Sequence, residues 1–264
     1  MGVDVASHFV TYETVGEIAH IGLNRPEKRN AISDRFVEAI ADAVARAERE
    51  AKAVVLYGHG NHFCAGLDLA EHVKKTAIEG VRGSRRWHAV FSGIEHGTIP
   101  WFSALHGAVV GGGLELAAST HIRVADETAF FALPEGQRGI FVGGGGSVRV
   151  ARLSGVARMT DMMLTGRVAS AAEAERWNLV QYVVPAGEAR KKAHDLAVVA
   201  ASNAALSNYA VINALPRIQD MAKEDGLFVE SFISSFTATS PEAEERLQAF
   251  LDKRAARLKA PGAN

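Results

Sequence analysis

The order in which strand and helix patterns follow one another most constrains how this chain can fold. Strand patterns dominate the first 60 residues, strands and helices alternate over 101–184, and only helical patterns follow Val184-Pro185. Strands that alternate with helices, followed by helices alone, indicate an α/β core that carries a C-terminal helical region. We therefore predict a core over residues 1–200 and a helical region over residues 201–264.

Individual segments carry clear signals. Residues 8–23 predict a β-hairpin, and Phe36, Ile40 and Val44 recur every four residues, which predicts a helix capped by Ser33 or Asp34. Short apolar runs predict strands over 53–57, 101–105 and 122–125. A glycine-rich turn is expected over 109–113, a helix from 114, and another helix after the glycines at 143–146. The C-terminal helices are expected over 187–201, 204–222, 223–237 and 241–258.

Charge and cysteine content exclude several classes of protein. The chain has 29 Lys and Arg against 30 Asp and Glu, so a polybasic partner of nucleic acid or of a membrane surface is excluded. The single cysteine, Cys64, cannot form an internal disulfide, which is compatible with a reducing compartment. The start, MGVDVASHFV, lacks a secretory signal, and no run of eighteen apolar residues occurs. We expect a cytoplasmic protein.

The first chemical motif is FCAGLDL, residues 63–69. A glycine between small and apolar residues lets another group approach the backbone closely, and it exposes the N–H of Leu67. A plain turn after a strand accounts for the same residues.

The second motif is AVVGGGLELA, residues 108–117. Its glycines put bare backbone N–H groups at the start of a helix, where negative charge is favoured, and Gly112 is the natural donor. Glu115 lies three residues further on. A capping contact or compensation of the helix dipole is the alternative role for Glu115.

The third motif is ALPEGQRGIFVGGGG, residues 132–146. Pro134 fixes the backbone just before Glu135, and apolar residues surround that carboxyl group. Such a setting raises a carboxyl pKa, as a general acid requires. A surface glutamate at the start of a helix is the alternative.

Other chemistries lack support. His59 and His62 are close in sequence, but no second cluster of ligands accompanies them, so we expect no metal site. Cys64 lies in a turn of small residues that suits packing better than nucleophilic attack. His106 and His121 border apolar strands and are expected to be hydrogen-bonded structural histidines.

A basic stretch leaves two interpretations open. It comprises Lys74, Lys75, Arg82, Arg85 and Arg86. Either these side chains form a solvated face, or they lie near an anionic ligand.

Taken in this order and spacing, the motifs resemble those of the crotonase (enoyl-CoA hydratase/isomerase) superfamily. The resemblance also covers LNRPEKRNAI at 23–32, LTGRVASAAEAERWNLVQYVVP at 164–185 and AFLDKR at 249–254. It implies an α/β spiral of repeated ββα units with a C-terminal helical region that forms trimers, which often pair into hexamers. It also implies an acyl-CoA thioester as substrate, with no separate cofactor.

The resemblance assigns roles to four residues. The thioester oxygen would lie between the N–H groups of Leu67 and Gly112, which would stabilise an enolate. Glu115 would hold and deprotonate a water that attacks Cβ of a 2-enoyl-CoA, and Glu135 would deliver a proton to Cα. An enoyl-CoA isomerase, or a hydrolase of a thioester or C–C bond, remains the alternative.

The resemblance also suggests residues that contact coenzyme A. Lys28 or Arg29 would pair with its phosphates, and the C-terminal positions would reach the CoA of a neighbouring subunit. The full expected set is Lys28, Arg29, Ala31, Ala65, Gly66, Asp68, Gly111, Phe250 and Lys253.

Some positions depart from the family pattern. His106 stands where hydratases commonly have asparagine, Val142 stands where many have proline, and Glu245-Arg246 replaces a frequent acidic-glycine pair. The departures suggest a divergent member with a non-standard acyl group. The 70–95 segment lines the acyl pocket in this family. Trp87, Phe91 and Phe141 would either accommodate a ring or shorten the pocket.

Overall fold

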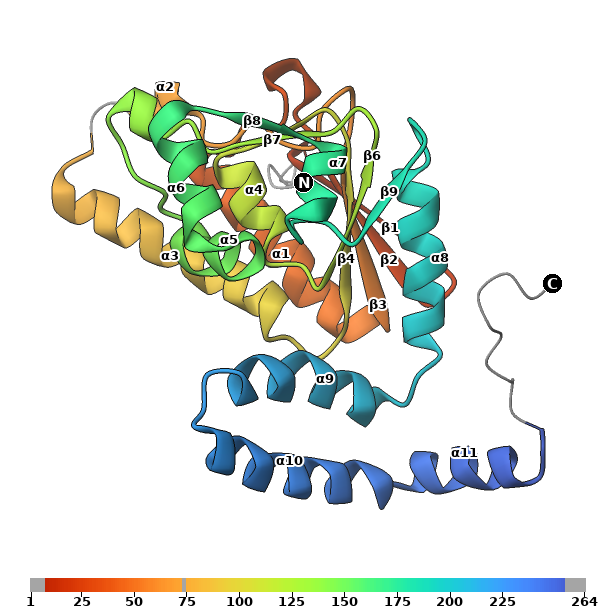
Figure 1. The fold of residues 1–264 in the computed structure, drawn as a ribbon. Coiled ribbons are helices and arrows are strands. Elements are labelled where there is room, and N and C mark those ends of the chain that lie inside the picture. Colours follow the sequence, from red (N-terminus) through yellow and green to blue (C-terminus); the bar gives the residue numbers. More distant parts are fainter. Residues whose placement is uncertain (1–7, 73–74, 255–264) are drawn as a thin grey trace. The chain divides into compact units, whose positions relative to one another are not determined.

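The computed structural model describes residues 8–72 and 75–254 (Figure 1). The chain divides into two compact units, one ending at Ser202 and the other beginning at Asn203. All strands that the structure describes belong to the first unit.

A six-stranded sheet forms the framework of the first unit. Its strands lie in the order β1-β2-β3-β4-β6-β9, and every neighbouring pair is parallel except the β1–β2 hairpin. This confirms the predicted hairpin and the three predicted strands. The bounds are Val10–Val15 (β1), Ile18–Leu23 (β2), Ala53–Gly58 (β3), Trp101–Leu105 (β4), Ile122–Asp126 (β6) and Tyr182–Val184 (β9).

A second, three-stranded sheet contains β5 (Ala108–Val110), β7 (Phe130–Ala132) and β8 (Val168–Ser170). Two isolated parallel bridges lie outside the named strands. Cys64 pairs with Val109 of β5, and Ile32 pairs with Leu67. The expected glycine turn over 109–113 is therefore partly wrong. Residues 108–110 are strand, because they pair with β7, and the reversal occurs at Gly111, whose φ of 54° suits glycine.

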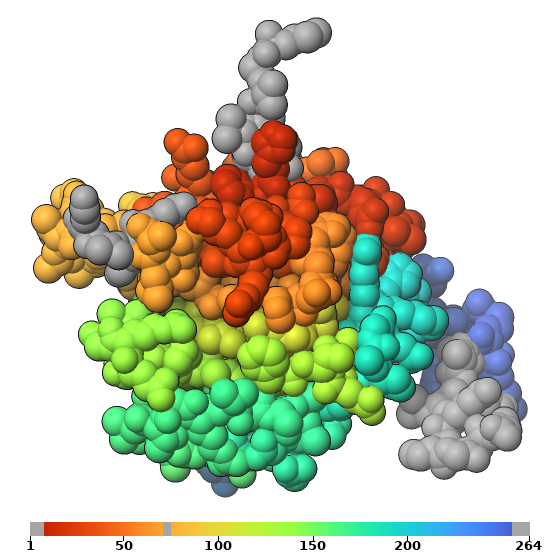
Figure 2. All heavy atoms as spheres, turned by 90° about the horizontal axis from the view of Figure 1, so that it is seen from above, coloured from red at the N-terminus to blue at the C-terminus, as the bar shows by residue number. Residues whose placement is uncertain are grey.

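The two sheets are built by a repeating path of the chain. The chain forms β4 in the large sheet, then β5 in the small sheet, and then α4 (Gly112–Ala117). It next forms β6 in the large sheet and β7 in the small sheet before α5 (Gly146–Ser154). Successive segments therefore stack in sequence order, which Figure 2 shows as bands from red through yellow to green. This is the spiral of ββα units that the resemblance implies.

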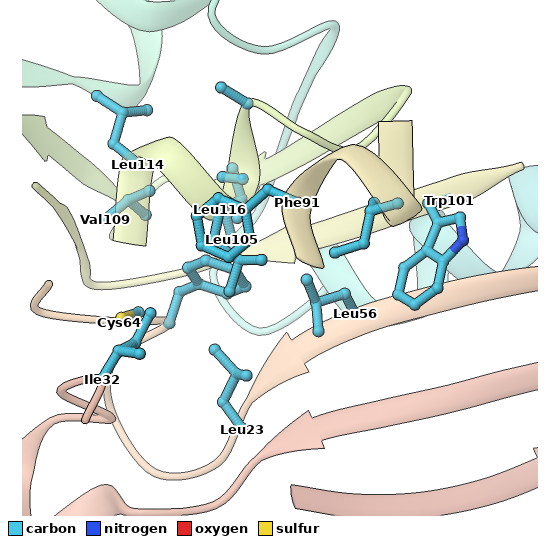
Figure 3. Close-up of a cluster of buried hydrophobic side chains, with 14 of the residues drawn as sticks. Leu23, Ile32, Leu56, Cys64, Phe91, Trp101, Leu105, Val109, Leu114 and Leu116 are labelled. Atoms are coloured by element: carbon cyan, nitrogen blue, oxygen red, sulfur yellow. The ribbon is translucent and has the colours of Figure 1, made fainter. Parts of the chain in front are cut away.

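One face of the large sheet packs against the long helices. Ser33 caps α1 (Asp34–Glu50) by accepting a hydrogen bond from the Phe36 N–H at 3.2 Å. The core beneath combines residues of α1, of α3 (Ala77–Glu95) and of both sheets. Figure 3 shows part of this cluster, including Leu23, Leu56, Phe91, Leu105 and Leu116.

The opposite face is covered by α8 (Ala189–Ala201). A stripe of buried alanines along α8 allows close packing against Val55 and Phe102 of the sheet. The stripe comprises Ala189, Ala193, Ala197 and Ala201.

The remaining elements of the first unit are short helices. They are η2 (Pro26–Lys28), α2 (Leu69–His72), η3 (Gly136–Arg138), α6 (Val156–Thr165) and α7 (Ala171–Arg176). The second unit contains α9 (Ala205–Ile218), α10 (Lys223–Ala238) and α11 (Pro241–Leu251).

Two of the expected C-terminal helices end early. α9 stops at Ile218 because Ala222 must become extended to begin α10, and α11 stops at Leu251 before the left-handed Lys253. Residues 255–258 of the last expected helix lie outside the described residues. Within the described chain no single helix is long and apolar enough to cross a membrane; only α8 and α9 together reach that length and composition.

Candidate active site

A cavity of about 480 Å³ opens beside α3 and the start of α4. The cavity is lined by Leu67, Gly112, Glu115 and Glu135, which lie in three separate sequence motifs. The volume is typical of a small-molecule site. Other lining residues are Asp34, Lys75, Gly80, Val81, Gly83, Ser84, Arg85, Trp87, Ile140, Phe141, Val142, Gly143 and Gly144.

Two backbone N–H groups meet in this cavity. Gly66 and Gly111 have positive φ angles of 95° and 54°, and each precedes one donor, Leu67 or Gly112. A Cβ atom on Gly66 would lie 3.3 Å from the Gly112 nitrogen, so the two turns touch. Among the described residues neither donor N–H has an acceptor. Both are available to a single oxygen atom.

Glu115 is buried, with 3% of its surface exposed. Its Oε1 atom accepts hydrogen bonds from the N–H groups of Gly144 at 2.8 Å and Gly146 at 2.7 Å. Burial raises the pKa of Glu115, although these donors and Arg149 oppose the rise. The side chain therefore reaches across to the loop before α5, and the alternative of a contact with its own helix end is not observed.

Glu135 is also buried, at 7% exposure, although it stands at the N-cap position of η3. Its Oε2 atom has no hydrogen-bond partner among the described residues. A Cβ atom on Gly111 would approach Oε1 to 2.8 Å, so the carboxyl group lies close to the turn that carries Gly112. Burial, helped by the nearby charge of Glu115, raises the pKa of Glu135 to about 6. A surface helix-start role is thus wrong.

Trp87 of α3 lines the apolar side of the cavity, and the fully buried Phe91 packs behind it. Trp87 packs so closely on the turn that a Cβ on Gly112 would approach its ring to 2.7 Å. The rings of Trp87 and Phe91 meet edge to face with centroids 5.6 Å apart. Phe141 lies on the rim and is 69% exposed. The space between these walls is mainly apolar, which suits an acyl chain.

The basic stretch is partly neutralised. Lys75 and Arg86 both contact Asp34, at 2.8 and 3.0 Å. Arg85 lines the cavity, whereas Lys74 lies outside the described residues. Arg86 is thus a paired surface charge, whereas Lys75 pairs with Asp34 and lines the cavity as Arg85 does. His106 and His121 are hydrogen-bonded to carbonyl oxygens, as expected.

The expected CoA-side loops lie against each other. The Ala65 N–H donates to the Arg29 carbonyl at 2.9 Å, and the Ile32 N–H, next to Ala31, donates to the Gly66 carbonyl at 2.7 Å. The loops that contain Arg29, Ala31, Ala65 and Gly66 therefore form one surface beside Leu67. Cys64 is buried behind it, and burial raises its pKa to about 12, so its thiol stays protonated.

The Asp68 carboxylate forms ion pairs with two basic side chains. Its Oδ2 atom lies 2.8 Å from Arg25 and 3.1 Å from Lys28, and its Oδ1 atom accepts the Ala70 N–H. Burial would raise the pKa of Asp68, but the two cations outweigh burial and lower it. Asp68 thus holds its loop together and places Lys28. Phe250 is 66% exposed on α11, and Lys253 follows that helix.

Sequence reasoning missed the support behind Glu115. The glycines at 143–146 predict only a helix start, and nothing local signals that their N–H groups bind a carboxylate about 30 residues earlier. Arg149 was missed as well; its signal is an arginine between Val148 and Val150 in an otherwise apolar stretch. No cluster of metal-ligating side chains occurs in the described parts of the chain.

Known proteins resemble this chain over almost its whole length. A model of the enoyl-CoA hydratase/isomerase family matches residues 13–261. Enoyl-CoA hydratase EchA19 of Mycobacterium tuberculosis is 32% identical over 249 residues, which cover 92% of this chain and 93% of that protein.

Solved structures agree with the fold. A candidate enoyl-CoA hydratase from Rhodopseudomonas palustris is 48% identical, with a TM-score of 0.92, over 96% of this chain and 98% of its own. The enoyl-CoA hydratase of Bacillus anthracis is 29% identical, with a TM-score of 0.88, over 95% and 99%. The architecture is thus the α/β crotonase fold with C-terminal helices, and the family implies an acyl-CoA substrate. The chain belongs to the enoyl-CoA hydratase/isomerase, or crotonase, family.

Proposed function

We propose that the protein is an enoyl-CoA hydratase that adds water across the double bond of a 2-enoyl-CoA thioester. The observation that carries the proposal is the presence of two buried glutamates, Glu115 and Glu135, in one cavity with two unpaired N–H groups. The relatives described as enoyl-CoA hydratases support the same reaction.

The N–H groups of Leu67 and Gly112 would receive the thioester oxygen. Attack at Cβ moves electrons through the conjugated system onto that oxygen, which becomes an enolate. Two fixed donors stabilise this charge more than they stabilise the neutral carbonyl, and removal of one such donor typically costs about 10²–10³ in rate.

The glutamates would move the two protons. Ionised Glu115, held by Gly144 and Gly146, accepts a proton from water as the water oxygen bonds to Cβ. Protonated Glu135 gives its proton to Cα as the enolate collapses. The product is the 3-hydroxyacyl-CoA, and proton exchange with a new water restores both carboxyl groups. The raised pKa of Glu135, about 6, suits a proton donor.

The loop surface beside Leu67 would bind the nucleotide end of the substrate. Lys28 is 48% exposed while it contacts Asp68, so its ammonium group can also reach a phosphate. Arg29, Ala31, Ala65 and Gly66 would line the path of the pantetheine arm. Phe250 and Lys253 would complete this surface from a neighbouring subunit.

Glu115 distinguishes a hydratase from an isomerase. An isomerase needs one proton carrier, and Glu135 with its unpartnered Oε2 could serve alone. The two hydrogen bonds that orient Glu115 favour a second carboxylate that positions water. A hydrolase would release free CoA, which a thiol reagent detects.

The test is turnover of crotonyl-CoA in water labelled with heavy oxygen, read by mass spectrometry. Wild type should form labelled 3-hydroxybutyryl-CoA, and Glu115→Gln and Glu135→Gln should each lose about 10²–10⁴ in kcat. Binding of CoA thioesters, measured by calorimetry, should persist in both variants. If wild type binds crotonyl-CoA and longer or cyclic 2-enoyl-CoAs but labels none of them, the hydratase assignment is wrong.

The second unit would mediate assembly into homotrimers or hexamers. Phe228, Phe232 and Phe236 recur every four residues on α10 and are 66%, 61% and 66% exposed. Such a row of aromatic residues is typical of a surface that another subunit covers. Light scattering should give a multiple of the 28.2 kDa chain mass. Phe232→Glu should reduce that multiple, whereas Glu230→Gln, on the other side of α10, should not.

A further inference from the structure

Arg149 stands out among the buried charged residues, because its contacts end next to Glu115. It lies on α5 and only 9% of it is exposed. Its guanidinium group donates to Glu95 Oε2 at 2.7 Å, to Ser92 Oγ at 3.0 Å and to the Gly144 carbonyl at 3.1 Å. A guanidinium group suits this role because its rigid fork can bind several acceptors at once.

The Gly144 contact connects Arg149 to the candidate base. The carbonyl of Gly144 accepts from Arg149, while its N–H donates to Glu115 Oε1. The loop over residues 143–146 consists of glycines, so no side chain of its own can hold it in place. Two side chains donate to its carbonyl oxygens: Arg149 to Gly144, and Ser84 to Gly143 at 2.6 Å.

The charge of Arg149 acts on the same carboxylate. Arg149 opposes the burial that raises the pKa of Glu115. The other charged group that faces Glu115 is Glu135, which acts in the opposite sense, and His88 and Glu95 of α3 face Arg149 itself. Among the described cations, Arg149 is the one whose charge lowers the pKa of Glu115, whereas Arg138 acts on Glu135.

We propose that Arg149 is a positioning residue for hydration: it fixes the glycine loop that orients Glu115 and places a positive charge behind the peptide that binds that carboxylate. The inference rests on the proposed function, because it assumes that Glu115 is the base. Arg149 itself touches neither substrate nor reacting atoms. It acts through the Gly144 peptide and through its charge.

Three variants separate the two contributions. Arg149→Gln removes the charge and should lower kcat about 10–100-fold with little change in KM, as part of the effect expected for a positioned base. It should also shift the acidic limb of the profile of kcat against pH to a higher pH, by about one pH unit. Arg149→Lys keeps the charge but loses the fork, so kcat should fall while the limb stays in place. Ser84→Ala removes the neutral anchor and should leave the limb unmoved.

Two further variants test whether loss of stability, or the removal of any arginine from α5, explains the effects. Arg149→Gln leaves Glu95 without its buried cation, which could destabilise the protein. The double variant Glu95→Gln/Arg149→Gln removes both charges and should retain the shifted limb. Arg152→Gln, on the exposed side of α5, should behave as wild type.

A titration without substrate separates this inference from the proposed function. In protein labelled with ¹³C at the glutamate carboxyl groups, the Glu115 resonance is identified by its absence in Glu115→Gln. The pH midpoint of the Glu115 titration should rise in Arg149→Gln and stay near the wild-type value in Arg149→Lys and Ser84→Ala. An unchanged midpoint in folded Arg149→Gln overturns the inference, whatever the hydration assay shows. Wild type that fails to hydrate any enoyl-CoA overturns the proposed function and with it the role of Arg149 in hydration, whereas the titration still decides whether Arg149 acts on Glu115.

Discussion

The carboxyl group of Glu135 lies against the α-carbon of Gly111, so that a Cβ atom at position 111 would approach Oε1 to 2.8 Å. Gly111 is also the residue whose backbone, with φ 54° and ψ −123°, presents the Gly112 N–H. One glycine therefore sets both the position of a donor and the position of the proposed acid.

Gly111→Ala should disable the site. The new methyl group must displace Glu135, and the backbone angles disfavour alanine, at a cost of about 1–3 kcal/mol in stability. We expect kcat for hydration to fall by about 10² or more, because the general acid leaves its place. Gly155→Ala is the control, since φ is 85° there and nothing lies within 4 Å of the new Cβ. Equal losses of kcat in the two folded variants would contradict the argument.

The raised pKa of Glu135 predicts a pH dependence of stability. Its folded value is about 6 against an ordinary value of 4.5, so between these values the folded chain binds the proton more tightly than the unfolded chain. The contribution of Glu135 to the free energy of unfolding is therefore fully present below pH 4.5 and is lost as pH rises through about 6.

Urea unfolding of wild type and Glu135→Gln from pH 4 to 8 measures this effect. The stability of wild type relative to the variant should fall as pH rises across that window and become constant above it. Since Glu115 is present in both proteins, the difference reports Glu135 together with its interaction with Glu115. A relative stability that stays constant would show that folding leaves the pKa of Glu135 unchanged, and one that rises with pH would show that folding stabilises the carboxylate; either result contradicts the prediction.

Lys28 offers a test of the nucleotide end. If its ammonium group pairs with a CoA phosphate, Lys28→Gln should raise KM for crotonyl-CoA about 10-fold with kcat unchanged, which corresponds to about 1.4 kcal/mol. Asp68 keeps its contact with Arg25, so the loop should remain in place. A crotonyl pantetheine thioester without the nucleotide should show no change. Lys52→Gln, which removes an exposed pair with Glu17, is the control.

The parts of the fold that were predictable carry their signal within one segment. The Ser33 cap and the four-residue spacing of α1 lie within a few turns, and the apolar run of β3 is bounded by Gly58. The strands β5, β7 and β8 have three residues each, too few for an alternating pattern. They exist because of pairing with distant residues, such as Val109 with Phe131.

The site, like the fold, has residues that a local motif reveals and contacts that depend on packing. Leu67, Gly112 and Glu135 each stand directly beside glycine or proline in a short motif, and Glu115 lies two residues after Gly113, so all four could be picked out. The hydrogen bonds from Gly144 and Gly146 to Glu115, and those from Arg149 to α3, depend on how α3, α4 and α5 pack. Sequence spacing contains no direct information about such contacts, so this support became visible only in three dimensions.

The alanine stripe of α8 gives a prediction about stability alone. Ala197 is fully buried in the cluster that includes Val55 and Phe102, so the helix approaches the sheet without room for a larger side chain. Ala197→Leu should destabilise the first unit by about 1–3 kcal/mol through overpacking, seen as a lower urea midpoint at unchanged m-value.

Val199→Leu is the matched control for that change. Val199 lies on the same helix but is 65% exposed, so the added carbon meets solvent and the free energy of unfolding should change by less than about 0.5 kcal/mol. Because both variants place leucine in the same helix, helix propensity cannot produce a large difference between them. If Ala197→Leu unfolds at the same urea concentration as Val199→Leu, the contact between α8 and the sheet is looser than the buried alanines indicate.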